Sequence, residues 1–313
     1  MKRFRKIVVG VDLKLDGKGL TPGTWLAVNQ ARWLAERVES HVTLVHSRAS
    51  DECWDAEEKG YVVRPTVTPA VDQQTLEQLA AGFQERNIRT ALVSVTEAAW
   101  LAITRQVLHE EADLVIVGKR TRADDDLRKI GSVTNKLLRK CPCAVWAVNP
   151  GSDPNPKTVL AATDLSPVGR RVVEVAASLV AEYRSQLHVV HAYQLPLDVQ
   201  MEGTRAREEF DNQMRSKATE EIEGQLRGAA LERAASLHIG LTSPTRAILE
   251  CVDRLAPDLI VMGTISRGGI PGVLVGNTAE RLLHRLDCSL LTVKPDDFVC
   301  PVEPKGLATP VAE

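Results

Sequence analysis

The stretch Ala-Asp-Leu-Val-Ile-Val-Gly at 112–118 returns 145 residues later as Pro-Asp-Leu-Ile-Val-Met-Gly at 257–263. A second glycine follows each stretch after thirteen residues, Gly131 in the first copy and Gly276 in the second. Each second glycine opens an amphipathic segment that ends in a short Val/Leu run. A repeat this long indicates two copies of one whole domain rather than a solenoid of small units.

Length and composition agree with a duplicated globular protein. The chain has 313 residues, which is enough for two domains of ordinary size. It is 44% hydrophobic and 26% charged, as soluble globular proteins are. The net charge of -2 argues against a nucleic-acid partner, which would need a strongly basic surface. No apolar run reaches the length of a membrane span, and no secretory signal follows the basic start, so we expect a cytoplasmic protein.

The cysteines give no metal or redox motif by their spacing. None forms a Cys-x-x-Cys pair, and no histidine cluster has zinc spacing, so no metal site is predicted. We interpret them as small buried hydrophobic residues in a reducing compartment, with redox or metal chemistry as the less favoured alternative. The six positions are Cys53, Cys141, Cys143, Cys251, Cys288 and Cys300.

Both halves alternate short β-branched runs with longer helical patterns. This order predicts an α/β fold, a mainly parallel and doubly wound sheet covered by helices on both faces. Strands are expected at 6–12, 41–46, 89–95, 113–117 and 143–148, and again at 157–163, 186–191, 238–242, 258–262 and 288–293. Helices are expected at 22–38, 69–86, 97–110 and 132–140, and again at 167–183, 205–237, 244–255 and 277–286.

The domain boundaries follow from a short linker rich in turn formers at 149–156. We predict a first domain at 1–150 and a second at 157–295. The tail at 296–313 contains three prolines and no periodicity, so it is expected to be a loosely attached C-terminal extension.

Ligands of open parallel sheets bind at the carboxyl ends of the strands, so candidate residues must lie just after strands. Asp12 and Asp164 each follow a first strand, and Gly118 and Gly263 each end a fourth strand. The aspartates could equally be helix caps or turn residues. His46 and His191 end the second strands, where capping a sheet edge is favoured over acid–base catalysis.

The loop at 263–278 gives the sharpest signal. Its glycines allow backbone amides to approach a ligand, and Gly276, Asn277 and Thr278 begin a helix that would favour an anion such as phosphate. Ser266 lies in this loop, and Arg267 adds positive charge. Asn277 or Thr278 could also be ordinary N-caps. The loop is apolar as well, and an apolar ligand such as a lipid is an alternative; its apolar residues are Ile265, Ile270, Pro271 and Val273–Val275.

The corresponding loop of the first half, 118–132, is more charged. Gly131 and Ser132 suit phosphate at a helix start, but the acidic triplet at 124–126 would repel it. We therefore interpret this loop as a charged surface loop and rank the second half ahead as a ligand site.

These motifs resemble the universal stress protein family. The resemblance rests on a strand that ends in Asp-Leu-Ile-Val-Met-Gly, the spaced glycines after it, and Asp12 and Asp164 at the first strands. Gly-Asn-Thr-Ala-Glu at 276–280 and Val-Lys-Pro-Asp at 293–296 are similar to the tandem, E-type members. The resemblance implies two tandem flavodoxin-like (Rossmann-like) domains, each a five-stranded parallel sheet with helices on both faces. It also implies that the two domains form a pseudodimer by pairing their last strands, 144–148 and 290–293.

Nucleotide-binding members use the strand-end Asp against the base or sugar, and the Gly loop with its following hydroxyl against the phosphates. This chain departs from that pattern. Thr121 and Ser266 replace the middle glycine, and Asn277 replaces the final hydroxyl residue that Ser132 keeps. A Cβ where backbone must approach phosphate weakens binding, so ATP is expected to bind a degenerate site at best.

The resemblance therefore predicts a non-enzymatic stress-response protein that supports survival under DNA damage, oxidative stress or starvation, with a small ligand in the second domain. The sequence contains no nucleophile elbow, P-loop or zinc signature that would indicate catalysis. An ATP-binding switch or weak nucleotide hydrolase is the first alternative, and a lipid carrier is the second. Expected partners are the two domains themselves, a second copy of the chain, and a small molecule.

Overall fold

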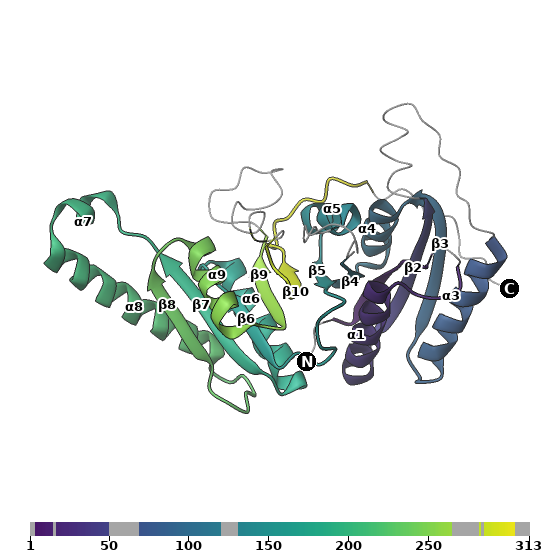
Figure 1. Cartoon of the computed structure of the whole chain (residues 1–313), viewed down its shortest axis with the longest axis horizontal. Coiled ribbons are helices and arrows are strands. Elements are labelled where there is room, and N and C mark those ends of the chain that lie inside the picture. Colours follow the sequence, from purple (N-terminus) through teal and green to yellow (C-terminus); the bar gives the residue numbers. More distant parts are fainter. Residues whose placement is uncertain are drawn as a thin grey trace. The chain divides into compact units, whose positions relative to one another are not determined.

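The computed structural model describes residues 4–14, 17–49, 69–119, 131–264, 282 and 285–303, and every structural statement below concerns these (Figure 1). The chain forms two compact units. The first runs to Pro154 and also takes in the segment that begins at Phe298, while the second runs from Asn155 to Asp297.

The first unit is a parallel five-stranded sheet with the strand order β3-β2-β1-β4-β5. Helices α1 and α3 cover one face, and α4 and α5 cover the other (Figure 1). Its elements are β1 (Lys6–Val11), α1 (Pro22–Val38), β2 (His41–Ala49), α3 (Pro69–Gln84), β3 (Thr90–Ala98), α4 (Ala99–Glu110), β4 (Leu114–Gly118), α5 (Ser132–Lys140) and β5 (Ala144–Val148).

The second unit repeats this order as β8-β7-β6-β9-β10, again with parallel pairing. Helices α6 and α8 pack together on one face, and α9 packs against β7. Its elements are β6 (Thr158–Ala162), α6 (Pro167–Tyr183), β7 (Gln186–Tyr193), α7 (Leu197–Met201), α8 (Thr204–Leu226), β8 (Ser236–Leu241), α9 (Pro244–Leu255), β9 (Leu259–Gly263) and β10 (Ser289–Val293). The two tandem α/β domains predicted from the sequence are confirmed.

Helix boundaries are predicted best where the capping chemistry is complete. Helices α1, α6 and α9 begin at the predicted proline, which stands first in the helix where no backbone N–H is needed. The residue before each proline is a hydroxyl N-cap. Thr21, Ser166 and Ser243 each accept a hydrogen bond from the backbone amide of the residue three positions later. Each of these helices ends at a left-handed residue that closes the last turn.

The helix predicted at 205–237 is wrong at its C-terminal end. Helix α8 stops at Leu226, Gly228 follows with a φ of 84°, and β8 already begins at Ser236. The short helix α7 was not predicted. The charged sequence of α8 favours a helix, and the end signal that the prediction missed is Gly228, a glycine of positive φ just past the last turn. The helix expected at 277–286 lies outside the described residues, apart from Leu282, Arg285 and Leu286.

The cores consist of aliphatic residues on strands that are buried on both faces. In the first unit, Ile7, Val8 and Val9 of β1 are fully buried, as are residues 114–116 of β4. A non-alternating apolar pattern of this kind is typical of parallel sheets covered on both sides. None of the described helices combines the length and apolar character that a membrane crossing requires.

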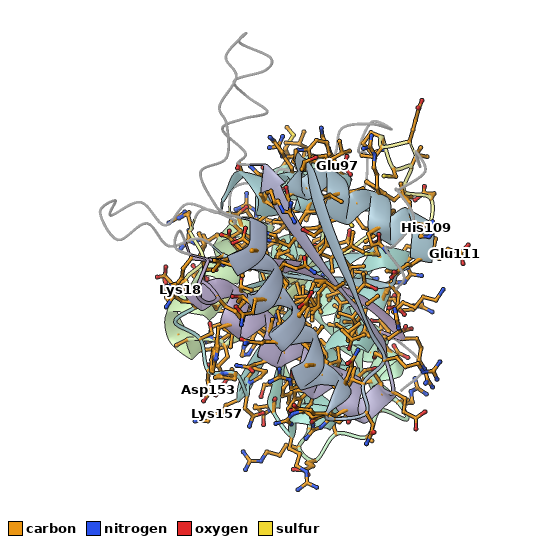
Figure 2. The ribbon with its side chains drawn as sticks, turned by 90° about the vertical axis from the view of Figure 1, so that its right-hand side faces the viewer. Lys18, Glu97, His109, Glu111, Asp153 and Lys157 are labelled. Carbon is orange, nitrogen blue, oxygen red and sulfur yellow. The ribbon has the colours of Figure 1, made fainter. Side chains whose placement is uncertain are left out.

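In the first unit, α4 begins at the edge of the sheet where the strands have their carboxyl ends. Glu97 precedes this helix; its carboxylate pairs with Arg105, and its carbonyl accepts a hydrogen bond from Ser47. Figure 2 labels Glu97 at this end of α4 and His109 and Glu111 at the other. Strands β2 and β3 each run three residues beyond their predicted ends to reach this edge.

Candidate functional site

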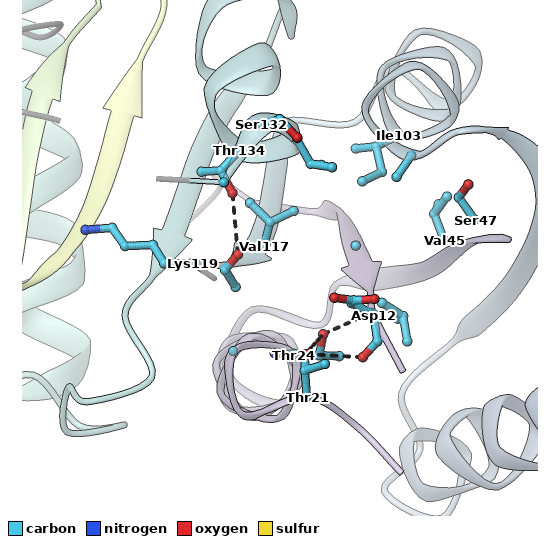
Figure 3. A pocket seen from close by; sticks show the side chains of 17 residues that line it. Asp12, Thr21, Thr24, Val45, Ser47, Ile103, Val117, Lys119, Ser132 and Thr134 are labelled. Carbon is cyan, nitrogen blue, oxygen red and sulfur yellow. Dashed lines mark hydrogen bonds between the residues drawn. The ribbon is translucent and has the colours of Figure 1, made fainter. Parts of the chain in front are cut away.

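A pocket of about 100 Å³ lies in the first unit at the carboxyl ends of β1 and β4 (Figure 3). These strands are neighbours although α1, β2, α3, β3 and α4 separate them in sequence, so the strand order reverses here. Ligands of open α/β sheets bind at such a point. The lining residues are Gly10, Val11, Asp12, Thr21, Gly23, Thr24, Val45, Ser47, Ala99, Ile103, Val117, Gly118, Lys119 and 131–134.

The floor of the pocket is apolar. Val45, Ile103 and Val117 contribute aliphatic side chains from β2, α4 and β4. Gly10 lies between them, and a Cβ added there would stand 2.8 Å from both Ile103 Cδ1 and Val117 Cγ1. Any larger residue at this position would displace the floor. The pocket can therefore accept an apolar group against this surface.

Asp12 lies on the wall formed by the start of α1. Its backbone amide donates to Thr24 Oγ1 at 2.9 Å, and its carbonyl accepts from the Thr21 amide at 3.1 Å. Thr21 is the N-cap of α1, so the first turn of this helix fixes the backbone of Asp12. Figure 3 shows Asp12 on the α1 side of the pocket and Ser132 on the α5 side. The structure thus brings Asp12, at the end of β1, to the same pocket as Gly131 and Ser132 at the start of α5, although the sequence favoured a charged surface loop there.

Gly118 also lies at the pocket, but its close neighbour is protein. A Cβ at Gly118 would lie 2.4 Å from the carbonyl carbon of Gly23 and 2.6 Å from its Cα. A Cβ added at Gly23, on the other side of the same contact, would lie 2.8 Å from the Lys119 carbonyl oxygen. The backbone of α1 therefore packs directly on the end of β4, and the two glycines make this approach sterically possible.

The N-terminus of α5 forms the opposite wall. Its N-cap, Gly131, has a φ of -59° and supplies no side-chain hydrogen bond to the first turn. The first amides of a helix have no acceptor within the helix, and the helix dipole adds positive potential there. Residues 131–134 line the pocket, and Thr134 Oγ1 donates to the Gly118 carbonyl at 3.4 Å. This wall is suited to a phosphate or another anion.

Lys119 does not supply charge to the pocket. Its amide donates to the Val148 carbonyl at 2.7 Å, and Figure 3 shows its side chain pointing away from Asp12 and Ser132. The side chain is 8% exposed. Among the described lining residues, backbone amides and hydroxyl groups are the ones that could hold an anion in this part of the pocket.

In the second unit, Asp164 holds a turn. Its Oδ1 accepts from the Ser166 amide at 3.0 Å and from the Ser166 hydroxyl at 2.5 Å. Ser166 in turn caps α6 by accepting from the Gly169 amide at 3.1 Å. Leu165, between them, has a φ of 61°, a left-handed conformation that this turn stabilises. The turn role considered for this aspartate is therefore present in the structure, whereas the N-cap of α6 is Ser166.

The other candidates of the second unit are only partly described. Gly263 ends β9 as expected. Five further candidates lie outside the described residues, and so does Thr121 of the first domain. Their role as ligand contacts stays a prediction. These five are Ser266, Arg267, Gly276, Asn277 and Thr278.

His46 and His191 have equivalent positions, three residues before the end of β2 and two before the end of β7, rather than at the strand ends expected from the sequence. His46 Nδ1–H donates to the Val11 carbonyl at 2.9 Å, and His191 Nδ1–H donates to the Thr163 carbonyl at the same distance. Both rings are buried. Each histidine therefore bonds its own strand to the C-terminal end of the neighbouring strand, which is a structural role.

Sequence reasoning missed several pocket residues. Thr21, Thr24, Val45 and Ile103 carry no chemical motif, and only the fold brings them beside Asp12. Thr21 had a usable signal, since a hydroxyl residue before a proline at the start of a helical pattern predicts an N-cap.

A second cluster of polar residues lies away from the pocket, on β7 and β8. His188 Nδ1 is 3.0 Å from His238 Nε2, and His238 Nδ1 accepts from Arg254 Nη2 at 2.8 Å. Because Arg254 donates to one nitrogen of His238, the other carries the proton and donates to His188. The pair and Arg254 form a hydrogen-bonded chain, and no group of three or more metal-ligating side chains occurs among the described residues.

This histidine pair predicts a loss of stability in mild acid. Burial first, and then the charge of Arg254, lowers the pKa of both rings below the ordinary value of 6.5. The unfolded chain therefore binds more protons between the lowered pKa values and 6.5, and the free energy of unfolding falls as the pH is lowered through this window. Thermal unfolding followed by circular dichroism at a series of pH values should show a smaller pH dependence for His238→Gln. The exposed His109→Gln is the control, and an equal pH dependence in both variants would refute the assignment.

The sequence matches one known protein family over both domains. A family model described as the universal stress protein family matches residues 3–149 and 155–294. The chain belongs to this family. The two matched segments confirm the tandem organisation, and the family places the chain among stress-response proteins.

Relatives and solved structures agree. Universal stress protein E of Photorhabdus laumondii is 29% identical over 266 residues, covering 79% of this chain and 82% of that protein. Universal stress protein E of Escherichia coli is 30% identical over 217 residues, covering 64% and 67%. A functionally unknown protein from Pseudomonas aeruginosa has a TM-score of 0.69 at 21% identity, covering 95% of each chain. A universal stress protein from Archaeoglobus fulgidus has a TM-score of 0.64 at 17% identity, covering 93% of this chain and 98% of that one. At these identities the solved structures show the fold alone.

Proposed function

We propose that the chain is a non-enzymatic, cytoplasmic stress-response protein that works by binding a small phosphate-bearing ligand in the first domain. The observation that carries this proposal is the pocket at the strand-order reversal, with the N-terminus of α5 on one side and Asp12 on the other. Among the described lining residues only Asp12 and Lys119 ionise, and Lys119 points away. A binding role agrees with the sequence, in which no nucleophile elbow, P-loop or zinc signature occurs.

A nucleotide is the ligand class that best fits both walls. The apolar floor of Val45, Ile103 and Val117 can pack against a base or sugar, and the start of α5 can bind phosphate. The volume of about 100 Å³ is below the roughly 300–1,000 Å³ of typical ligand sites. The described pocket therefore accommodates part of a nucleotide, and ATP with magnesium is the first ligand to test.

The second domain remains a competing location. Its candidates Asp164 and Gly263 stand at the equivalent strand ends, and the loop at 265–278 carries the glycines and Arg267 on which the sequence-based ranking rests. The apolar residues of the same loop keep lipid binding as an alternative outcome. Both ideas depend on residues outside the described part of the chain.

Native mass spectrometry of the freshly purified chain tests this proposal. Denaturing analysis then identifies any molecule that is released. We expect a nucleotide mass, or uptake of added ATP with magnesium. A lipid mass would instead support the carrier, and multiple-turnover hydrolysis of a nucleotide would contradict the non-enzymatic assignment. A chain that is ligand-free and ignores added nucleotide would refute the proposal.

A further inference from the structure

Two thiol groups contact each other where α5 leads into β5. The connection is Cys141-Pro142-Cys143, and the two Sγ atoms are 3.6 Å apart, in hydrogen-bond contact. Cys143 Sγ also donates to the Ala144 carbonyl at 3.4 Å. A disulfide needs an S–S length of about 2.05 Å, so rotation of the two side chains has to close a gap of roughly 1.6 Å. Among the described cysteines, these two are the ones whose sulfurs contact.

The two sulfurs differ in their access to solvent. Cys141 is fully buried, whereas Cys143 is half-buried. Of the pair, Cys143 is therefore the residue with more access to a small oxidant. A second thiol in contact with the first lets a sulfenic acid end as a disulfide.

The second domain shows that packing alone does not require this pair. Cys288 stands at the position of Cys143, but Leu286 occupies the position of Cys141. Leu286 is buried, as Cys141 is. Since an aliphatic side chain fills the equivalent place, packing at this position does not require a sulfur atom.

A third thiol lies near the pair without contacting it in the same way. Cys300, in the segment that returns to the first unit, donates to the Lys140 carbonyl at 3.3 Å. Lys140 immediately precedes Cys141. Cys300 could therefore form a disulfide with one of these two cysteines in place of the Cys141–Cys143 bond, and any test has to include it.

We propose that Cys141 and Cys143 form a reversible disulfide, so that the start of β5 is a site of thiol oxidation by hydrogen peroxide. The Cys143 thiolate attacks one peroxide oxygen, the O–O bond breaks, and hydroxide leaves and takes up a proton as water. The sulfenic acid so formed is attacked by the Cys141 thiolate, which forms the S–S bond and breaks the S–O bond. The hydroxide that leaves takes up a proton as a second water. Two electrons pass from the two thiols to one peroxide, and a dithiol reductant reverses the reaction.

The surroundings of Cys143 make this oxidation strongly dependent on pH. Burial first, and then the hydrogen bond with Cys141, raises the pKa of the Cys143 thiol well above its usual range. Because the thiolate is the reacting species, the rate should rise about tenfold for each unit of pH across the neutral range. A slow reaction at neutral pH suits a response to sustained rather than brief oxidant exposure.

Peptide mapping of the full chain tests the proposal. The reduced protein is treated with hydrogen peroxide, its remaining thiols are blocked with N-ethylmaleimide, and it is digested with trypsin. Cleavage after Lys140 and Lys157 places both cysteines on one peptide, 141–157. We expect this peptide to be two hydrogens lighter and unblocked at both cysteines, and to regain two blocked thiols after treatment with dithiothreitol.

Two variants keep the result interpretable. Cys141→Leu copies the second domain, so it should fold and should lose the lighter peptide, while Cys300→Ser should keep it. Peptide 141–157 carrying one or more oxygens on Cys143 and no disulfide, or a cross-link to Cys300, would overturn the proposal. So would a lighter peptide that forms at the same rate at every pH.

Discussion

Replacing Gly118 with alanine should lower the free energy of unfolding of the first domain by about 3 kcal/mol. The added Cβ would lie 2.4 Å from the carbonyl carbon of Gly23, which is backbone and cannot rotate away. Helix α1 would have to move off β4, and the wall that holds Asp12 would move with it. The effect should therefore reach the pocket as well as the stability.

The positions of the tryptophans allow the stability of the first domain to be measured separately from that of the second. All five tryptophans, Trp25, Trp33, Trp54, Trp100 and Trp146, precede the second domain, so tryptophan fluorescence during urea unfolding reports on the first domain. Gly151→Ala is the matched control, because a Cβ there meets nothing within 4 Å. It should change the stability by less than about 0.5 kcal/mol. Equal unfolding midpoints for the two variants would contradict the packing assigned to Gly118.

Replacing Gly131 with aspartate should weaken the binding of ATP by about tenfold to a hundredfold. Gly131 is the N-cap of α5, and its φ of -59° is open to any residue, so the backbone can accept the change. An aspartate caps the helix with its carboxylate and places a negative charge where the phosphate would bind. The expected readout is the rise of the thermal midpoint with added ATP and magnesium, which should be largely lost.

Two controls separate charge from structure and one domain from the other. Gly131→Asn caps the helix equally well without the charge, so it should keep the midpoint shift. Gly276→Asp makes the same change at the repeat position of the second domain and should leave binding unchanged. Loss of the shift in Gly276→Asp alone would move the site to the second domain, where the sequence-based ranking put it.

The parts of the fold that the sequence predicts are those that local chemistry determines. Helices α1, α6 and α9 match their predicted bounds because a hydroxyl N-cap and a proline define each start. The end of α8 was mispredicted because the helix-favouring composition continues beyond it, and Gly228, whose positive φ marks the helix end, was passed over.

The candidate site divides in the same way. Asp12, Gly131 and Ser132 were found because strand ends and helix starts are visible in the sequence. Gly118 was interpreted as a ligand glycine, since its partner Gly23 lies in a distant part of the chain and only the structure reveals their contact. The contact between the sulfurs of Cys141 and Cys143 was equally hidden, because it depends on side-chain rotamers.

Hydrogen exchange followed by mass spectrometry, on the full chain with and without ATP and magnesium, tests the central claim most directly. The amides at the start of α5, from Gly131, and the turn from Asp12 to Thr24 form the two walls of the pocket. We expect slower exchange in these two segments when the ligand is bound. Protection confined to Asp164–Gly169 and the residues after Gly276, or no protection in either domain, would contradict the account.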